Sequence, residues 1–386
     1  MTQEIKMINF KTNLEPDPTY YFGNRITYEL ANLLSQYCYD RVYMVTNEVL
    51  LGLYGQEILH VFKQNSIAYE VVTIKDSEDH KTFDSLECLC ETLVEKNISK
   101  SSIIIGFGGG CLTNIVGLAA GMIFRGIRYI EMPTTLMGIT DSTLSNKQAV
   151  SGKSGKNQFG MYYAPIFIFG DTKYLKTESM SGRKSAIAEG VKNGFISDES
   201  LLTYYEMKLN ENVATYSEGE INELSLKIIQ SKLKILHTDP TEKDYAITLE
   251  YGHTFGHAME FFTKGRIPHG IAVAKGMCIA AELSHYLGYI PQSVVDKHYQ
   301  IFRGKLGLDI SIPDDVSVDD IMHGILSDNK KTATGTKYVL LKKIGECLNP
   351  DGDFQVFVEP EVVKKVLHDY KQKNAFVGVS KISKIS

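Results

Sequence analysis

The sequence predicts an α/β fold in which an N-terminal Rossmann-like nucleotide-binding domain precedes a mainly α-helical metal-binding domain. In the first half, short runs rich in β-branched residues alternate with longer runs of helical periodicity. After about residue 183, long segments rich in Leu, Lys, Glu and Ala dominate. Alternation of the first kind is typical of a parallel sheet covered by helices. We therefore expect a NAD-binding α/β domain over residues 1–182 and a metal- and substrate-binding domain over residues 183–386.

The expected strands are nearly continuous apolar runs, which suit parallel strands covered on both faces. They are Arg41–Thr46, Tyr69–Ile74, Ser102–Phe107, Ile127–Met132 and Ile166–Gly170. The expected helices are Leu50–Asn65, Phe83–Asn97, Leu112–Phe124, Ser185–Ile196, Glu218–His237, Gly252–Thr263 and Ile271–Leu287. The segment Ser142–Gly160, rich in Ser, Gly and Asn, is expected to be a loop.

The composition is that of an ordinary globular protein. Of 386 residues, 43% are hydrophobic and 23% are charged, which argues against disorder. A net charge of −5 gives no general attraction to nucleic acid or to an anionic membrane, so any phosphate site must be local. The amino terminus lacks a secretory pattern, and the most apolar run, Ile115–Phe124, is too short to span a bilayer. The six cysteines show no metal-type pairing, so we expect free thiols and a cytoplasmic location.

A glycine cluster occupies residues 106–110, between an expected strand and an expected helix. Glycines at such a turn let backbone amides approach a diphosphate at the positive end of the helix. The alternative is a plain strand-to-helix turn, because glycine clusters alone are weak signals.

Three histidines gather within residues 253–269, although the whole chain has only ten. They are His253 and His257, four apart in the run GHTFGH, and His269, with Glu189 as a possible acidic partner upstream. Three of these four side chains could make a metal site with one position open to substrate. The spacing leaves open whether both His253 and His257 bind the metal or one of them contacts the substrate. A single histidine is more often a hydrogen-bonded structural residue, but the clustering favours a site.

Polar side chains are scattered through the central loops. They are Asp141, Lys147, Lys156, Asn157 and Lys192. A lysine taken alone is most often a solvated surface residue. Lysines among Ser, Gly and Asn in one loop are instead suited to a small anionic ligand.

Together these segments resemble the dehydroquinate synthase superfamily, the sugar phosphate cyclases, from about Arg41 to Gly345. Seven ordered blocks carry the resemblance: Gly106–Gly126, Met132–Ser142, Gly155–Pro165, Ala188–Gly194, Glu250–Glu260, His269–Met277 and Asp328–Lys331. The resemblance implies a carbon–oxygen lyase that uses NAD and a divalent metal, zinc or cobalt, and that forms a homodimer.

The resemblance also assigns residue roles. The implied metal ligands are Glu189, His253 and His269. The residues implied near the substrate phosphate are His257, Lys147, Asn157 and, from the partner subunit, Arg125, with Lys156 on the same loop. The residues implied at the sugar hydroxyls are Asp141, Lys192, Lys232 and Lys330. The residues implied for NAD are Gly108, Gly109, Gly110, Asn114, Thr134, Thr135 and Asp141, with Asn47, Glu78 and Lys81 at its adenosine half.

The implied chemistry is a redox-assisted elimination. In this family NAD oxidises a ring hydroxyl to a ketone while the metal polarises that oxygen. The neighbouring C–H becomes acidic and phosphate leaves. The NADH then reduces the ketone, the ring opens, and an intramolecular aldol step closes the carbocycle.

The substrate branch is predicted from two positions. Family members that make dehydroquinate pair the carboxylate of a seven-carbon substrate with an Arg in an Arg-x-x-x-Asn-x-Gly-His-Thr segment. Here Ala246 and Glu250 hold the positions of that Arg and Asn. The chain resembles instead the 2-deoxy-scyllo-inosose synthases, which act on glucose 6-phosphate in aminoglycoside-type antibiotic biosynthesis. Glu250 then becomes a candidate to accept hydroxyl hydrogen bonds or to move a proton.

Three other functions remain as alternatives. Dehydroquinate synthase is the nearest of them. A metal-dependent alcohol or glycerol dehydrogenase shares the two-domain plan but would produce net NADH. A non-catalytic protein derived from a cyclase would bind neither metal nor NAD. One departure from the family pattern is Ile271, which stands where relatives carry Glu and could alter the surroundings of the metal.

Overall fold

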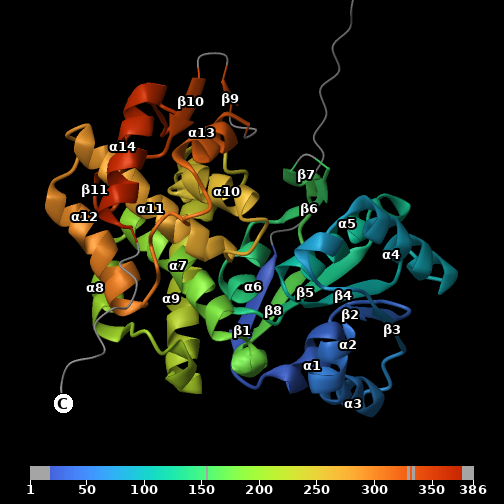
Figure 1. Ribbon diagram of the computed structural model, residues 1–386. Coiled ribbons are helices and arrows are strands. Elements are labelled where there is room, and N and C mark those ends of the chain that lie inside the picture. The colour runs from blue at the N-terminus through green and yellow to red at the C-terminus, as the bar shows by residue number, and fades with distance from the viewer. Residues whose placement is uncertain (1–17, 154, 328–330, 333–334, 376–386) are drawn as a thin grey trace, which may run out of the picture. The chain divides into compact units, whose positions relative to one another are not determined.

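The computed structural model describes residues 18–153, 155–327, 331–332 and 335–375 (Figure 1). These residues form two compact units. The first unit contains the described residues up to Phe22 together with residues 26–133 and 146–170. The second contains residues 23–25, residues 134–145 and the chain from Asp171 onward, so it begins before residue 183, where the sequence placed the boundary.

The first unit is built on a six-stranded sheet. In spatial order its strands are β1 (Thr19–Gly23), β8 (Phe167–Asp171), β5 (Arg128–Pro133), β4 (Ile103–Gly108), β2 (Val42–Thr46) and β3 (Tyr69–Thr73). The pairs β3–β2, β2–β4, β4–β5 and β5–β8 are parallel. All five expected strands are confirmed, and β1 adds an edge that the sequence analysis missed.

Helices cover both faces of this sheet (Figure 1). They are α1 (Leu30–Leu34), α2 (Glu48–Leu50), α3 (Gln56–Gln64), α4 (Phe83–Glu95) and α5 (Gly110–Met122). Buried residues of α4 and α5 pack with those of β2, β4 and β5 in one continuous hydrophobic core. Burial of such a face, about 25 cal/mol per Å² of apolar surface, is the main force that holds the layers together.

Residues 142–160 do not form the expected loop. Its greater part is an antiparallel hairpin of β6 (Lys147–Gly152) and β7 (Gly155–Tyr162). Gln148, Ala149 and Val150 are buried, whereas the residues of β7 are almost all exposed. A strand with no buried face lacks the apolar alternation from which strands are predicted.

The second unit is mainly helical. Its helices are α6 (Leu136–Thr140), α7 (Met180–Ser197), α8 (Glu199–Lys208), α9 (Glu218–Thr238), α10 (His253–Phe262), α11 (His269–Tyr286), α12 (Gln292–Tyr299), α13 (Val318–Ser327) and α14 (Pro360–Lys373). Its short strands are β9 (Lys331–Thr332), β10 (Gly335–Tyr338), β11 (Leu341–Lys343), β12 (Glu346–Cys347) and β13 (Val356–Phe357). All four helices expected here are confirmed.

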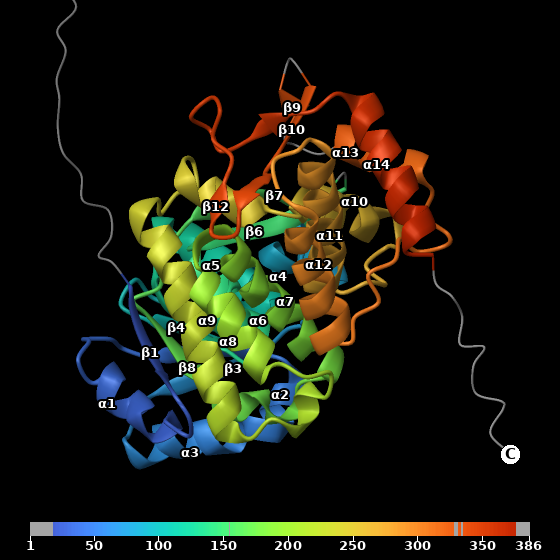
Figure 2. The same cartoon turned by 90° about the vertical axis from the view of Figure 1, so that its left-hand side faces the viewer.

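Helices α7 and α11 lie side by side (Figures 1 and 2). They meet at Gly270, whose N–H donates to the Ser185 hydroxyl at 2.8 Å. A Cβ atom on Gly270 would lie 1.9 Å from the Ser185 carbonyl oxygen, so only glycine fits there. Both helices are buried along most of their length.

No helix of the described residues is long and apolar enough to cross a membrane. All six cysteines are free thiols, as expected.

Candidate functional site

The three clustered histidines converge in the second unit. His253 and His257 lie on the first turns of α10, and His269 is the first residue of α11. One ring nitrogen from each lies within 4.8 Å of the others. Gly252 makes the entry to α10 possible: its φ is +82°, and a side chain there would collide with the backbone of Val273 and Met277.

Glu189, from the middle of α7, points at the same centre. Its Oε1 lies 3.7 Å from His253 Nε2 and 3.6 Å from His269 Nε2. Ligands held about 2.1 Å from one tetrahedral ion lie about 3.4 Å apart, so this spacing fits a shared divalent cation. Glu189 is buried, and its Oε1 has no hydrogen-bond partner among the described residues. A buried carboxylate oxygen without a partner is costly, and a metal ion would satisfy it.

The other ring nitrogens of two histidines are held by protein groups. His269 Nδ1 lies 2.9 Å from Glu260 Oε2, and His253 Nδ1 lies 3.4 Å from the Tyr251 carbonyl oxygen. Such contacts leave each Nε2 directed at the centre, as in many metal sites. Burial alone would lower the pKa of His269, but the hydrogen bond to Glu260 and the charges of Glu260 and Glu189 raise it.

Two lysines line the site, each paired with a carboxylate. Lys192 donates to Glu189 Oε2, and Lys232 donates to Asp141 Oδ1 at 2.6 Å. Burial opposes ionisation of Asp141, yet the charges of Lys232 and Lys192 hold its pKa below the usual value. The pKa of Lys192 is raised in spite of burial by Glu189, Asp141 and, less strongly, Glu250. Glu250 therefore lies within electrostatic range of Lys192.

The predicted residues Thr134 and Thr135 belong to the second unit. Thr134 is buried, and the Thr135 hydroxyl caps α6 by accepting from the Gly138 N–H at 3.0 Å. The next amide, of Leu136, donates to both carboxylate oxygens of Glu178, at 3.0 and 3.1 Å. Burial raises the pKa of Glu178 to about 7.

A second polar cluster surrounds the glycine turn of the first unit. Gly108 ends β4, Gly109 is the N-cap of α5, and Gly110 begins α5. Asp76, which the sequence analysis missed, accepts from the amides of Gly109 at 3.0 Å and Leu112 at 3.2 Å. The available signal was its position just after the parallel strand β3, at the carboxyl ends of the strands, where ligands of α/β folds bind.

The predicted nucleotide residues join this cluster. Asn47 donates to Asp76 at 3.3 Å, and Lys81 donates to Asn114 at 2.8 Å and to Asn157 at 2.5 Å. Asn157, expected near the substrate phosphate, thus lies beside the residues expected to hold NAD. Burial lowers the pKa of Lys81.

Glu78 completes this cluster: it accepts from the Cys111 thiol at 3.0 Å and from the Ser151 hydroxyl at 3.4 Å.

The remaining predicted residues lie on the first unit or outside the described part, and the charge of Lys156 acts on Lys81. Lys147 begins β6, and Lys156 lies exposed on β7. Arg125 is exposed in a turn with a φ of +67°. Lys330 lies outside the described residues.

Comparison with known proteins gives two family matches that together span residues 71–331. Residues 71–185 match the model described as 3-dehydroquinate synthase N-terminal, and residues 186–331 match the one described as 3-dehydroquinate synthase C-terminal.

Curated relatives cover most of the chain. The 2-deoxy-scyllo-inosose synthase of Streptomyces kanamyceticus is 32% identical over 335 residues, 86% of this chain and 85% of that protein. The 3-dehydroquinate synthase of Methylococcus capsulatus is 34% identical over 314 residues, 80% of this chain and 86% of that protein. Among solved structures, 2-deoxy-scyllo-inosose synthase complexed with carbaglucose-6-phosphate, NAD+ and Co2+ superposes with a TM-score of 0.84 and 29% identity, covering 91% of this chain and 96% of that one.

Proposed function

Because this chain belongs to the 3-dehydroquinate synthase family of sugar phosphate cyclases, we propose that it converts glucose 6-phosphate to 2-deoxy-scyllo-inosose with elimination of phosphate. The proposal includes catalytic NAD, a divalent metal and a place early in aminoglycoside-type antibiotic synthesis. The alternative within the family is dehydroquinate synthesis, since one relative of similar identity carries that activity.

The choice of glucose 6-phosphate over a carboxylated sugar rests on one observation. Every arginine of the second unit already binds a protein group. Arg183 is buried and donates to the carbonyl oxygens of Val213 and Leu175. The other three also bind protein groups: Arg25 pairs with Glu218, Arg266 with Asp315, and Arg303 with Asn374. The cations beside the histidines, Lys192 and Lys232, already face carboxylates. A substrate carboxylate would therefore meet no spare guanidinium there, whereas the hydroxyls of glucose need none.

Glu250 supports the same choice. It is the last residue of a 3₁₀ turn, Tyr245–Glu250, directly before the block that carries His253. A carboxylate here accepts hydrogen bonds from sugar hydroxyls and disfavours a substrate carboxylate. We assign it to bind a hydroxyl and to carry a proton during turnover.

We assign Glu189, His253 and His269 as the metal ligands, on the strength of their spacing and of the unpartnered Glu189 oxygen. A divalent ion bound there supplies a Lewis acid for a substrate oxygen. His257 then remains for the substrate phosphate, and Lys192 orients the Glu189 carboxylate by donating to its other oxygen, Oε2. The Asp141–Lys232 pair offers both an acceptor and a donor to neighbouring hydroxyls.

For NAD we assign the polar cluster of the first unit. The amides of Gly109 and Leu112 donate to Asp76, so Asp76 marks the donors that polar groups of a dinucleotide would meet. Asn47, Glu78, Lys81 and Asn114 surround that point. Bound NAD supplies the hydride acceptor and returns the hydride within one turnover.

The homodimer is supported by an exposed apolar patch on the first unit, formed by the end of α5 and by β7. The patch residues are Met122, Phe124, Phe159, Met161 and Tyr162, each at least 40% exposed. Contiguous apolar surface of this kind is typical of an interface. Arg125 directly follows Phe124, one of the patch residues. A second copy bound to the patch would therefore lie beside Arg125.

The test is phosphate release by the purified chain with NAD and Co2+. Glucose 6-phosphate and the carboxylated seven-carbon substrate of dehydroquinate synthases are supplied in parallel. We expect release from glucose 6-phosphate without net NADH. We also expect Glu250→Gln, which keeps the side-chain size, to lower kcat about 100-fold. Release from the carboxylated sugar alone would overturn the substrate, and net NADH would indicate a dehydrogenase.

A further inference from the structure

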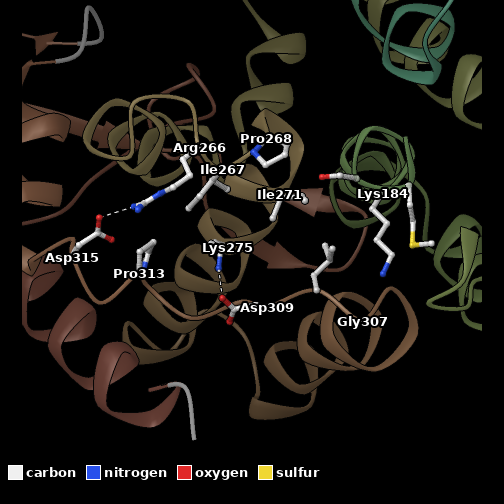
Figure 3. A pocket seen from close by; sticks show the side chains of 13 residues that line it. Lys184, Arg266, Ile267, Pro268, Ile271, Lys275, Gly307, Asp309, Pro313 and Asp315 are labelled. Carbon is white, nitrogen blue, oxygen red and sulfur yellow. Dashed lines mark hydrogen bonds and ion pairs between the residues drawn. The ribbon is translucent and has the colours of Figure 1, made fainter. Parts of the chain in front are cut away.

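A cavity of about 620 Å³ opens in the second unit, and none of the residues that line it is assigned above to metal, substrate or NAD (Figure 3). Its walls come from the first turn of α7, from α11 with the segment before it, and from residues 307–315. The lining is Met180, Ser181, Lys184, Arg266, Ile267, Pro268, Ile271, Lys275, Gly307, Leu308, Asp309, Pro313 and Asp315. Its volume falls within the range of small-molecule sites.

The charges of the lining do not cancel. Arg266 pairs with Asp315 at 2.6 Å, and Lys275 pairs with Asp309 at 3.2 Å (Figure 3). Lys275 is buried and also donates to the Ser311 carbonyl oxygen at 2.7 Å. Lys184 is the third cation. It is partly buried, and no described residue gives it a hydrogen bond or an ion pair. The lining therefore carries one positive charge without a carboxylate partner.

Apart from Ser181, the rest of the wall is apolar. Met180, Ile267, Ile271 and Leu308 contribute hydrocarbon, with Pro268 and Pro313 between them. A fully hydrated ion such as free phosphate gains nothing from such a wall, whereas an anion with a hydrocarbon body buries that body against it.

We propose that this cavity binds a small organic anion with an apolar body, whose negative group pairs with Lys184. The body lies on Ile271 and Leu308, and the Ser181 hydroxyl offers a hydrogen bond to the same group. The two existing ion pairs hold the side walls in place. The proposal does not depend on the proposed function.

The test uses 8-anilinonaphthalene-1-sulfonate, a fluorescent anion with an apolar body, added to the full chain in the presence of NAD. Two substitutions separate charge from shape: Lys184→Gln removes the charge, and Lys184→Arg keeps it. We expect Lys184→Gln to weaken the binding of one probe molecule per chain about 10-fold and Lys184→Arg to weaken it little. The control Lys100→Gln removes the same charge from an exposed lysine of the first unit and should leave binding unchanged.

Ile271→Glu tests the apolar wall independently, since it places a carboxylate where the body of the anion lies. We expect it to weaken probe binding at least as much as Lys184→Gln does. Circular dichroism confirms folding, and if this variant does not fold the Gln and Arg pair decides alone. Displacement of the probe by benzoate and by phenyl phosphate shows which anionic group is preferred. Equal binding by the parent and Lys184→Gln, or displacement by neither competitor, would overturn the proposal.

Discussion

Glu189 is suited to a metal ion because one of its carboxylate oxygens is buried without a hydrogen-bond partner among the described residues. One of its oxygens receives the ammonium group of Lys192, and the other faces two imidazole nitrogens that are both acceptors when neutral. Without a cation, the second oxygen is buried and unpaired. At the proposed site, a metal ion would therefore relieve an unfavourable contact as well as form new ones.

Glu189→Gln tests this arrangement. The amide keeps the size of the side chain but removes the negative charge, so we expect Co2+ to bind at least about 100-fold more weakly. The affinity is measured by competition with a fluorescent chelator and needs no substrate. Glu260→Gln, which changes only the partner of His269 Nδ1, should cost about 10-fold. Equal affinities for the parent and Glu189→Gln would remove Glu189 from the ligand set.

For single residues, the sequence was a better guide to which side chains are candidates for the site than to the contacts that they make. The histidine cluster could be found because histidine is rare in this chain and two of the three lie four residues apart, whereas Glu189 was implied by the family resemblance. Glu260 could not, since acidic residues are common and its role depends on which imidazole the fold brings to it, and for Asp76 the sequence offered only its place after a strand. The contact between Asn157 and Lys81 could not be predicted, because it depends on a hairpin where the sequence indicated a loop.

At the scale of elements, α10 is held in place by a chain of buried contacts. The Tyr251 hydroxyl lies 3.0 Å from His298 Nε2, and His298 Nδ1 lies 2.8 Å from the Val294 carbonyl oxygen. Because a carbonyl oxygen only accepts, Nδ1 carries the proton, and Tyr251 donates to Nε2. The Tyr251 carbonyl in turn meets His253 Nδ1. Burial lowers the pKa of His298 to about 3, so this histidine stays neutral.

Tyr251→Phe should loosen this chain without touching a metal ligand. Loss of the hydroxyl leaves His298 Nε2 buried without a donor, which costs about 1–3 kcal/mol of stability. We expect Co2+ affinity to fall up to about 10-fold as the Tyr251 carbonyl shifts from His253. Tyr205→Phe is a matched control, because the Tyr205 hydroxyl is buried and has no partner among the described residues. If both variants bound Co2+ alike, the chain of contacts would have no positioning role.

Strand β5 carries a buried acid that makes stability depend on pH. Glu131 accepts from Gln148 at 3.0 Å, and burial raises its pKa from 4.5 to about 8. The folded state therefore holds a proton that the unfolded chain releases above about pH 4.5. The stabilisation is full below pH 4.5 and is lost as the pH rises to about 8.

Glu131→Gln should remove that dependence. We expect the urea midpoint of the parent to fall between pH 5 and pH 8.5 relative to that of the variant, as followed by circular dichroism. Substituting the exposed Glu95 by Gln should not change the slope. Parallel curves for the parent and Glu131→Gln would mean that Glu131 ionises normally.

At the scale of the whole molecule, the fold class was predictable and one surface was not. Apolar strands alternating with helices identify a parallel sheet because burial on both faces leaves few polar residues in the strands. The edge strand β1 and the exposed strand β7 escaped prediction because neither has a buried face to produce that pattern. Yet β7 supplies Phe159 and Met161, the apolar residues on which the proposed dimer depends.

Phe159→Asp should therefore give monomers. Its ring lies 5.0 Å from that of Phe83 and is 48% exposed, so the substitution disturbs the patch more than the core. Sedimentation equilibrium at micromolar concentration measures the change. Phe261→Asp alters an even more exposed phenylalanine of the second unit and should leave the dimer intact. A monomeric parent chain, or a dimer that survives Phe159→Asp, would contradict the proposed interface.

The contact at Gly270 limits which substitutions this sequence can accept. Glu189 lies one turn along α7 from Ser185, and His269 directly precedes Gly270. The close backbone contact between Ser185 and Gly270 therefore sets the separation of Glu189 and His269. Neighbouring side chains can be exchanged while that separation survives. A single methyl group at position 270 would force the two helices apart and move both metal-facing side chains at once. A chain that keeps this contact is thus confined to glycine at position 270.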